Sequence, residues 1–131
     1  MSNWLQKIAE QSPELQNILN KWKEQIPGIV LSVFEEESRI VLISLIIPKN
    51  KRKQGLGSKI VQELNQYADK VGKRIELSPG EKDPHHGTTS RSRLERFYKK
   101  LDFVKNKGRN TDYQTGETMY RKPQSKPMEN T

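Results

Sequence analysis

The chain has 131 residues, of which 31% are hydrophobic and 31% charged, and its formal net charge at neutral pH is +8. This length predicts one domain with a single modest core. The sequence has no cysteine, which excludes disulfides, zinc–thiolate sites and cysteine nucleophiles. It has no apolar run of about 18 residues and no signal-peptide pattern, so we expect a cytoplasmic protein without a membrane span.

The positive charge is concentrated in one part of the chain. Residues 47–110 contain 17 lysines and arginines against 7 acidic residues, whereas the remainder contains 7 against 9. A basic segment of this kind suits a phosphate-bearing cofactor or a nucleic acid equally well. Charge alone therefore leaves both partners open.

Residues 1–27 are predicted to form an N-terminal helical segment of the same domain. Trp4, Leu5, Ile8 and Ala9 follow helical spacing. Ser12-Pro13 then gives an N-cap followed by a proline at the first helical position. The next helix carries an apolar stripe and ends at Pro27-Gly28; the stripe consists of Leu15, Ile18, Leu19, Trp22 and Ile26.

Two β-rich runs follow, at residues 29–35 and 39–47, and the short link between them predicts an antiparallel hairpin. The second run is nearly all apolar, which predicts a central strand covered on both faces. An amphipathic helix over residues 56–71 ends at Gly72 and leads into a short strand at residues 74–77. A helix between two strands predicts a crossover connection.

A loop rich in Pro, Gly, Ser and Thr spans residues 78–90. The capping-box pattern Ser92-x-x-Glu95 then predicts the start of a helix, whose apolar face comprises Leu94, Phe97, Tyr98 and Leu101. Two strands near residues 103–104 and 117–121 complete a core predicted to span residues 28–122. Residues 123–131 are polar and are expected to be disordered.

The junction before the residue 56–71 helix carries the clearest chemical signal. Residues 52–58 read Arg-Lys-Gln-Gly-Leu-Gly-Ser, between the apolar strand and the amphipathic helix. Glycines at alternate positions permit a tight turn, and the first turn of a helix offers unpaired N–H groups to an anion. The spacing excludes a P-loop, and Ile60 stands where a dinucleotide fingerprint has its third glycine.

Two motifs in order carry a family resemblance. Arg52, Gly55 and Gly57 match the pattern Arg/Gln-x-x-Gly-x-Gly/Ala directly after a strand, and residues 98–103 resemble Tyr-x-x-x-Gly-Phe. Together they resemble the GNAT superfamily of N-acetyltransferases. The resemblance implies an α+β (three-layer α/β) fold, with a mixed, mostly antiparallel central sheet flanked by helices.

The resemblance also implies a site for acetyl-CoA as acetyl donor, without a metal. Tyr98 takes the position of the general acid that protonates the leaving thiolate; the competing interpretation is that Tyr98 only packs in the core. The residues implied to bind the cofactor are Ile46, Ile47, Arg52, Lys53, Gln54, Gly55, Leu56, Gly57, Ser58 and Ser90.

Two positions depart from the family pattern. Asp102 replaces the glycine before the final Phe, which predicts a different turn into the next strand, and Arg91 stands where many members carry an asparagine. The general base stays open, because spacing singles out none of the candidates. These are Glu35, Glu36, Glu37, Glu76, Glu81, His85 and His86.

The sequence therefore predicts an acetyltransferase in which an amine attacks the thioester directly. The acceptor is open: a small molecule, a protein or a nucleic-acid-linked amine. A monomer and a homodimer are both compatible with the pattern. The alternative is a basic nucleic-acid-binding protein with a vestigial or absent catalytic site, and contact with nucleic acid through the basic surface is compatible with either function.

Overall fold

The computed structural model of the chain describes residues 12–52, 54–79 and 91–124. The predictions for the first helix, for Lys53, for residues 80–90 with Glu81, His85, His86 and Ser90, and for the end of the tail lie outside these residues. In chain order the elements are α2 (Pro13–Gln25), β1 (Val30–Glu35), β2 (Arg39–Ile46), the 3-10 helix η1 (Lys49–Lys51), α3 (Leu56–Val71), β3 (Arg74–Leu77), α4 (Arg91–Lys99), β4 (Val104–Lys105), η2 (Gly108–Asn110) and β5 (Met119–Arg121).

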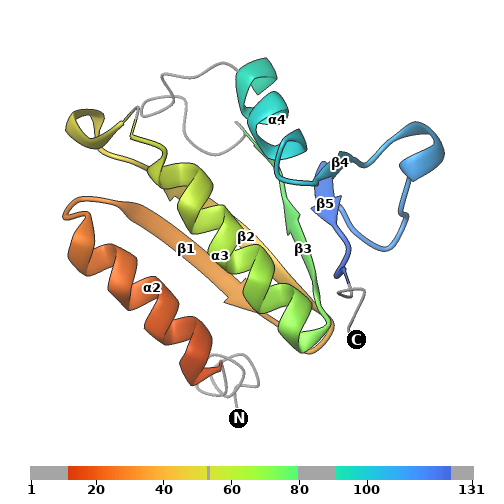
Figure 1. The fold of residues 1–131 in the computed structure, drawn as a ribbon. Coiled ribbons are helices and arrows are strands. Elements are labelled where there is room, and N and C mark those ends of the chain that lie inside the picture. The colour runs from red at the N-terminus through yellow and green to blue at the C-terminus, as the bar shows by residue number, and fades with distance from the viewer. Residues whose placement is uncertain (1–11, 53, 80–90, 125–131) are drawn as a thin grey trace, which may run out of the picture.

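The strands form one five-stranded sheet in the order β1-β2-β3-β5-β4 (Figure 1). β2 and β3 pair in parallel, and the other three neighbouring pairs are antiparallel. The predicted hairpin and the crossover through α3 are therefore confirmed. The α+β class with a mixed, mostly antiparallel sheet is confirmed as well.

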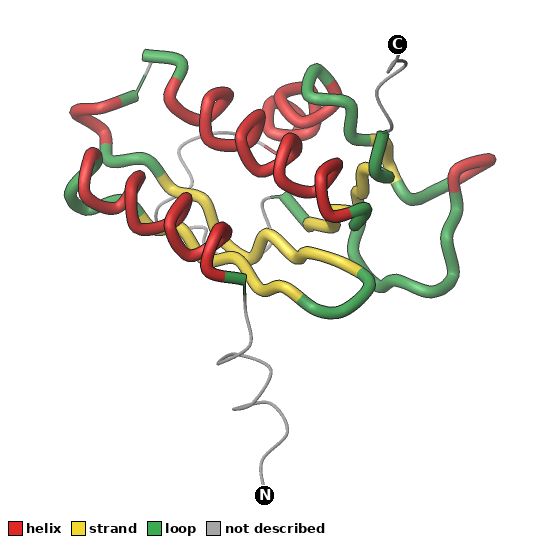
Figure 2. Tube along the Cα trace, turned by 60° about the horizontal axis from the view of Figure 1, so that its bottom comes forward, coloured by secondary structure: helices red, strands yellow, loops and turns green. Residues whose placement is uncertain are grey.

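The three helices lie side by side against the sheet (Figure 2). α3 is the central one, because the Trp22 indole of α2 donates to the Glu63 carboxylate of α3 at 2.8 Å, and the Asn65 amide of α3 donates to the Leu101 carbonyl after α4 at 3.2 Å. Side chains from all three helices and from the strands share one apolar core. Trp22 is thus a packing residue, as the sequence predicted.

The caps of α2 and α4 differ from one another in how well the sequence predicted them. The Ser12 hydroxyl accepts from the backbone N–H groups of Glu14 and Leu15 at 3.1 and 3.3 Å, which confirms this N-cap. Arg91 and Ser92, however, are both helical residues of α4, so Ser92 is not an N-cap and the capping-box prediction is wrong. The Glu95 carboxylate pairs with cationic side chains instead.

β2 occupies the predicted central position, but it is not covered on both faces along its length. Ile43 is 43% exposed, whereas Ile40 and Leu42 are buried against the helices. The prediction failed because a nearly all-apolar strand was taken to need two covering layers. Val71, an apolar residue at the end of the amphipathic helix α3, is 39% exposed and likewise lies outside the core.

Candidate functional site

The link between β2 and α3 is a short, internally bonded turn. The Lys51 N–H donates to the Pro48 carbonyl at 2.9 Å within η1, and the Arg52 Nε donates to the Ile47 carbonyl at 2.7 Å. The guanidinium of Arg52 thus ties the helix end of the link back to the strand end. This contact gives the motif arginine a positioning role that is visible without any ligand.

The two glycines of the motif are required for different reasons. Gly55 precedes α3 with φ +73, in the left-handed region, and a Cβ there would meet nothing within 4 Å. Gly57 lies within α3, and a Cβ there would sit 3.3 Å from the Cζ atom of Phe97 on α4. Gly55 therefore sets the turn, while Gly57 allows α4 to approach α3 closely.

The N-terminus of α3 is open to an anion. Its N-cap, Gly55, supplies no side-chain acceptor, and the first turn holds no acidic residue. Gln54 and Gly55 are exposed, and Leu56 to Ser58 are partly exposed. The first N–H groups of a helix lack intrahelical partners and carry the positive end of its dipole, so this turn is suited to a phosphate.

The sheet opens beside this turn. Pairing between β2 and β3 ends at Val41↔Glu76, although β2 continues to Ile46. On its other side β2 has a bulge, because Leu42 pairs with Val33 and Ser44 pairs with Ser32, which leaves Ile43 without a β1 partner. The β3-facing backbone of β2 beyond Val41 is thus unpaired with β3, and it leads to the glycine turn.

Tyr98 lies in the core beneath the same helices. Its side chain is 6% exposed, and its ring meets Phe97 and Phe103 edge to face at centroid distances of 4.9 and 5.5 Å. Burial raises the pKa of the Tyr98 phenol well above its ordinary value. The hydroxyl is therefore held protonated, as a proton donor requires, and the ring is also the packing element that the competing interpretation foresaw.

At the end of α4, Asp102 forms the same turn that a glycine would form. Asp102 has φ +77, its N–H donates to the Lys99 carbonyl, and the Phe103 N–H donates to the Tyr98 carbonyl, both at 3.1 Å. These two bonds form the helix-ending motif in which glycine is the usual left-handed residue. The prediction of a different turn is therefore wrong, because an aspartate tolerates this conformation better than most residues do.

Glu35 is engaged in a buried network far from the glycine turn. Burial by itself would raise the pKa of the Glu35 carboxyl, but hydrogen bonds from Lys73 at 2.8 Å, Tyr67 at 2.7 Å and the Ser12 N–H at 3.3 Å outweigh it and lower this pKa. Glu35 pairs with Ile40, six residues before the end of β2, or about 20 Å along the strand. The structure does not bring it to the site.

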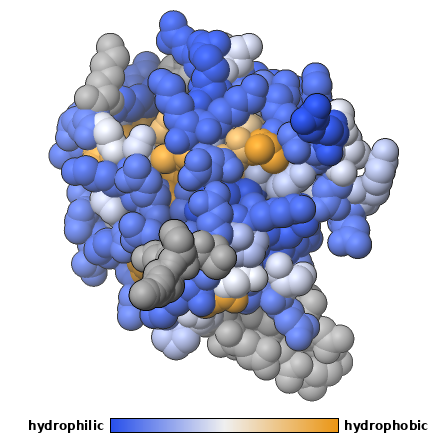
Figure 3. Space-filling model, turned by 45° about the vertical axis from the view of Figure 1, so that its right-hand side comes forward, coloured by the Kyte–Doolittle hydropathy of each residue, from blue (hydrophilic) through white to orange (hydrophobic). Residues whose placement is uncertain are grey.

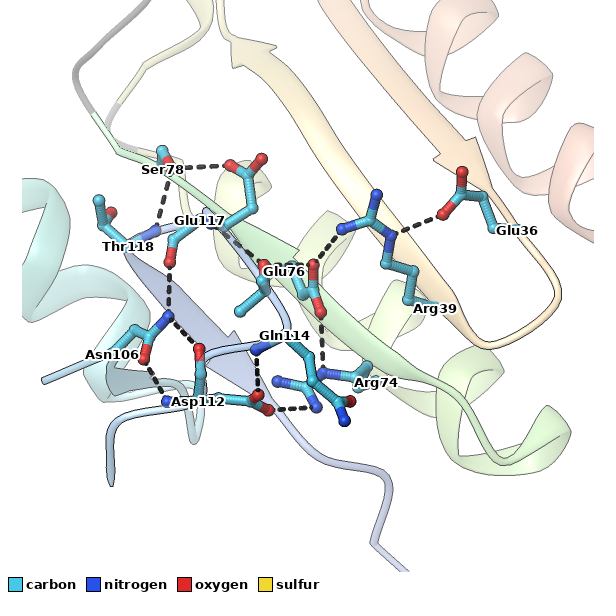
Figure 4. A network of polar contacts seen from close by, with 11 residues as sticks. Glu36, Arg39, Arg74, Glu76, Ser78, Asn106, Asp112, Gln114, Glu117 and Thr118 are labelled. Carbon is cyan, nitrogen blue, oxygen red and sulfur yellow. Dashed lines mark hydrogen bonds and ion pairs between the residues drawn. The ribbon is translucent and has the colours of Figure 1, made fainter. Parts of the chain in front are cut away.

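The other acidic candidates of the hairpin and of β3 are also remote or engaged. Glu36 pairs with Arg39 at 2.6 Å, and Glu37 is exposed in the same hairpin. The Glu76 side chain is 3% exposed and lies between the guanidinium groups of Arg39 and Arg74, at 2.7 and 2.9 Å (Figure 4). The Glu76 carboxylate is thus already engaged by two arginines, and Glu36 and Glu37 lie in the hairpin at the other end of β2, so these residues are not favoured as the base.

One carboxylate that the sequence did not single out lies at the open end of β3. The Ser78 hydroxyl, directly after β3, donates to the Glu117 carboxylate at 2.7 Å and accepts from the Thr118 N–H at 3.0 Å (Figure 4). Within the described ranges, Glu117 has no lysine or arginine partner. The sequence gives only a weak signal for it, a carboxylate at the start of the last strand.

A hollow on the described part of the surface lies elsewhere. It has a volume of about 720 Å³ and runs between α2 and α3, where Lys21–Glu63 and Lys70–Glu14 ion pairs line it. It contains none of the predicted site residues. Among the described residues no cluster of three or more metal-ligating side chains occurs, and no helix is long and apolar enough to cross a bilayer.

Comparison with known proteins gives matches at the level of structure. No family model matches the chain, and no curated protein matches it. The anti-CRISPR protein AcrVA5 superimposes with a TM-score of 0.54 at 24% identity, over 71% of this chain and 88% of its own. Ard1 from Thermoplasma volcanium gives 0.53 at 15% identity, over 85% and 78%, and Tetrahymena GCN5 gives 0.50 at 12% identity, over 84% and 88%. All three are GNAT acetyltransferases.

Proposed function

We propose that this chain, which has the GNAT fold, is an acyltransferase that moves an acetyl group from acetyl-CoA to an amine. The observation that carries the proposal is the N-terminus of α3, which has no side-chain cap, behind the left-handed Gly55 and beside the part of the β2 edge that is not paired with β3. A phosphate site next to an extended backbone edge suits a ligand that has a pyrophosphate followed by a chain with amide groups.

Different described residues would bind the pyrophosphate and the pantetheine arm of acetyl-CoA. The N–H groups of Leu56, Gly57 and Ser58 would hold the pyrophosphate, with Gln54 and Gly55 at the rim and Arg52 bracing the turn. The β2 edge up to Ile46 and Ile47 would bond the amides of the pantetheine arm. Lys53 and Ser90 are proposed contacts from outside the described residues. Exposed Lys49 and Lys59 add positive charge beside the turn.

The reaction needs a neutral amine, a stabilised oxyanion and a proton for the leaving thiolate. The amine nitrogen attacks the thioester carbon, the carbon–sulfur bond breaks, and we assign the proton that neutralises the departing sulfur to the Tyr98 hydroxyl. The raised pKa of this buried phenol keeps that proton in place near neutral pH. The chain has no cysteine, so no thioester intermediate can form on the protein, and we propose that the acetyl group passes directly from acetyl-CoA to the amine.

Glu117 is the carboxylate that we assign to the acceptor side. The only described partner of its carboxylate is the Ser78 hydroxyl, so a charge remains to bind an ammonium group and to take up its proton. Glu37 offers a matched control, because it is exposed in the hairpin at the other end of the sheet. Glu117→Gln should raise KM for the amine or lower kcat about 100-fold, and Glu37→Gln should change neither.

Calorimetric titration with acetyl-CoA is the direct test. We expect one site per chain, and transfer of label from acetyl-CoA should be found by mass spectrometry in a panel of small amines, proteins and aminoacylated nucleic acids. The panel identifies the acceptor, which the fold does not encode. Absence of acetyl-CoA binding by the folded protein would overturn the proposal.

A further inference from the structure

The exposed side of α4 and the segment between β4 and β5 (residues 106–118, here called the arm) carry most of the net positive charge of the chain. Residues 91–109 contain eight arginines and lysines against two acidic residues. Arg96, Lys99 and Lys100 are exposed on α4 and at its end, and Lys107 and Arg109 are exposed on the arm. We call these five residues the basic strip. Seen from the side that Figure 3 brings forward, the surface is mostly hydrophilic.

The strip is not neutralised by neighbouring carboxylates. Glu95 is the acidic residue of α4, and its side chain, 16% exposed, pairs with Arg91 at 3.5 Å and with Lys105 at 3.3 Å. Asp102 is exposed beside the end of the helix. Within the described ranges no residue of the strip forms an ion pair. Arg96 is three and four residues from Lys99 and Lys100, the spacing at which like charges on one helix face repel, and a polyanion would relieve that repulsion.

The cofactor site does not account for the strip. α4 meets the start of α3 at Phe97 and Gly57, but its end lies at Asn65, whose amide donates to the Leu101 carbonyl. Gly57 and Asn65 are eight residues apart, or about 12 Å along α3. The strip therefore leads away from the N-terminus of α3, where the pyrophosphate would be bound.

An aromatic side chain stands at the far end of the strip. Tyr113 is 94% exposed, and it lines with Arg109 and Lys122 a hollow of about 450 Å³ on the arm. Asp112 also lines this hollow, and its carboxylate is paired with the Arg74 guanidinium at 2.6 Å. An exposed aromatic ring among cations is an unfavourable element for solubility but an effective platform for a nucleobase. The aromatic residues of α4 itself, Phe97 and Tyr98, face inward and are not available for stacking.

We propose that the basic strip and Tyr113 bind single-stranded nucleic acid, with phosphates along α4 and a base stacked on the Tyr113 ring. The strip provides charge without base readout, so the binding is independent of sequence and strongly dependent on salt. Tyr113 distinguishes this ligand from an acidic protein surface, which has no base to stack, and from a duplex, whose bases are already stacked.

The test measures binding of labelled 20-nucleotide DNA and RNA single strands, the duplex of the same sequence and poly-glutamate, by fluorescence anisotropy over a salt series. Arg96→Gln/Lys100→Gln is compared with Lys23→Gln/Lys70→Gln, which removes the same charge from α2 and from the end of α3. The first pair should weaken single-strand binding about tenfold and reduce the slope of log K against log salt by about 1.4; the control should leave that slope unchanged.

Tyr113→Ala should weaken single-strand binding about 5- to 100-fold at an unchanged salt slope. Tyr113→Phe, which keeps an aromatic ring, should retain the wild-type affinity. Thermal melting and acetyl-CoA titration of each variant show that fold and cofactor site are intact, so this result stands apart from the proposed transferase activity. Absence of single-strand binding, equal weakening by the control pair, or equal affinity for poly-glutamate or duplex would each overturn the proposal.

Discussion

Substituting the two left-handed glycines at the ends of α3 separates backbone strain from ligand binding. Gly55 before the helix has φ +73 and Gly72 after it has φ +72, and a Cβ at either position would meet nothing within 4 Å. Alanine therefore costs only the left-handed conformation, about 1–2 kcal/mol. Alanine also restricts the unfolded chain more than glycine does, which offsets about 0.4–1 kcal/mol of this cost. Each variant should lose about 1 kcal/mol of unfolding free energy, or about 3–5 °C in Tm.

Only Gly55→Ala should affect the cofactor. If the strained turn relaxes, at least one N–H group at the start of α3 moves away from the pyrophosphate, and a hydrogen bond to a charged group contributes about 1.5–3 kcal/mol. The Kd for acetyl-CoA should then rise about 10- to 150-fold in Gly55→Ala and stay within about twofold in Gly72→Ala. Calorimetry and thermal melting on the same samples give both quantities. Equal Kd values for the two variants, with equal losses of Tm, would refute the assignment of this turn to the cofactor.

Three further substitutions test other parts of the molecule. Tyr98→Phe should lower kcat about 100-fold or more at an unchanged Kd for acetyl-CoA, which presteady-state and equilibrium measurements separate, and an unchanged kcat would remove Tyr98 as the acid. Asp102→Gly should change Tm by less than about 3 °C, because the relief of about 1 kcal/mol at a left-handed residue is offset by about 0.4–1 kcal/mol of added freedom in the unfolded chain; a loss of more than about 5 °C would contradict the strain argument. The lowered pKa of Glu35 means that its stabilisation is complete above its unfolded pKa near 4.3 and is lost as pH falls through the folded value. Glu35→Gln should therefore cost about 3 kcal/mol at pH 7 and much less at pH 3, and an equal loss of Tm at both would exclude this carboxylate as the source.

The sequence predicted well those elements that depend on neighbouring residues. The cap at Ser12 and the stripe through Trp22 were correct, and the helix end predicted at Pro27-Gly28 lies within two residues of the observed end at Gln25, since caps and 3.6-residue periodicity are local. The capping box at Ser92 failed because the same residue types occur within the first turn of a helix. Likewise an apolar strand does not reveal how many layers cover it, which is decided by how distant helices pack.

The candidate site was predictable where one motif forms it and not where the fold assembles it. Gly55 and Arg52 were predicted from spacing alone, and the structure shows a local role for each in the turn between β2 and α3. The contact of Gly57 with Phe97, and that of Ser78 with Glu117, join residues about 40 apart in the chain, so no local pattern indicates them. The acidic candidates of the hairpin fell away for the same reason, because only the sheet register shows their distance.

The short parallel pairing between β2 and β3 also bears on how the protein opens. Three residue pairs, from Arg39↔Arg74 to Val41↔Glu76, join a two-stranded ribbon to a three-stranded one. Each ribbon keeps its own antiparallel ladder if this seam parts, and the seam itself is the one parallel pairing of the described sheet, which is slightly less stable per residue than an antiparallel one. Amide exchange should therefore report two cooperative units, and a ligand that bridges them should slow exchange in both together.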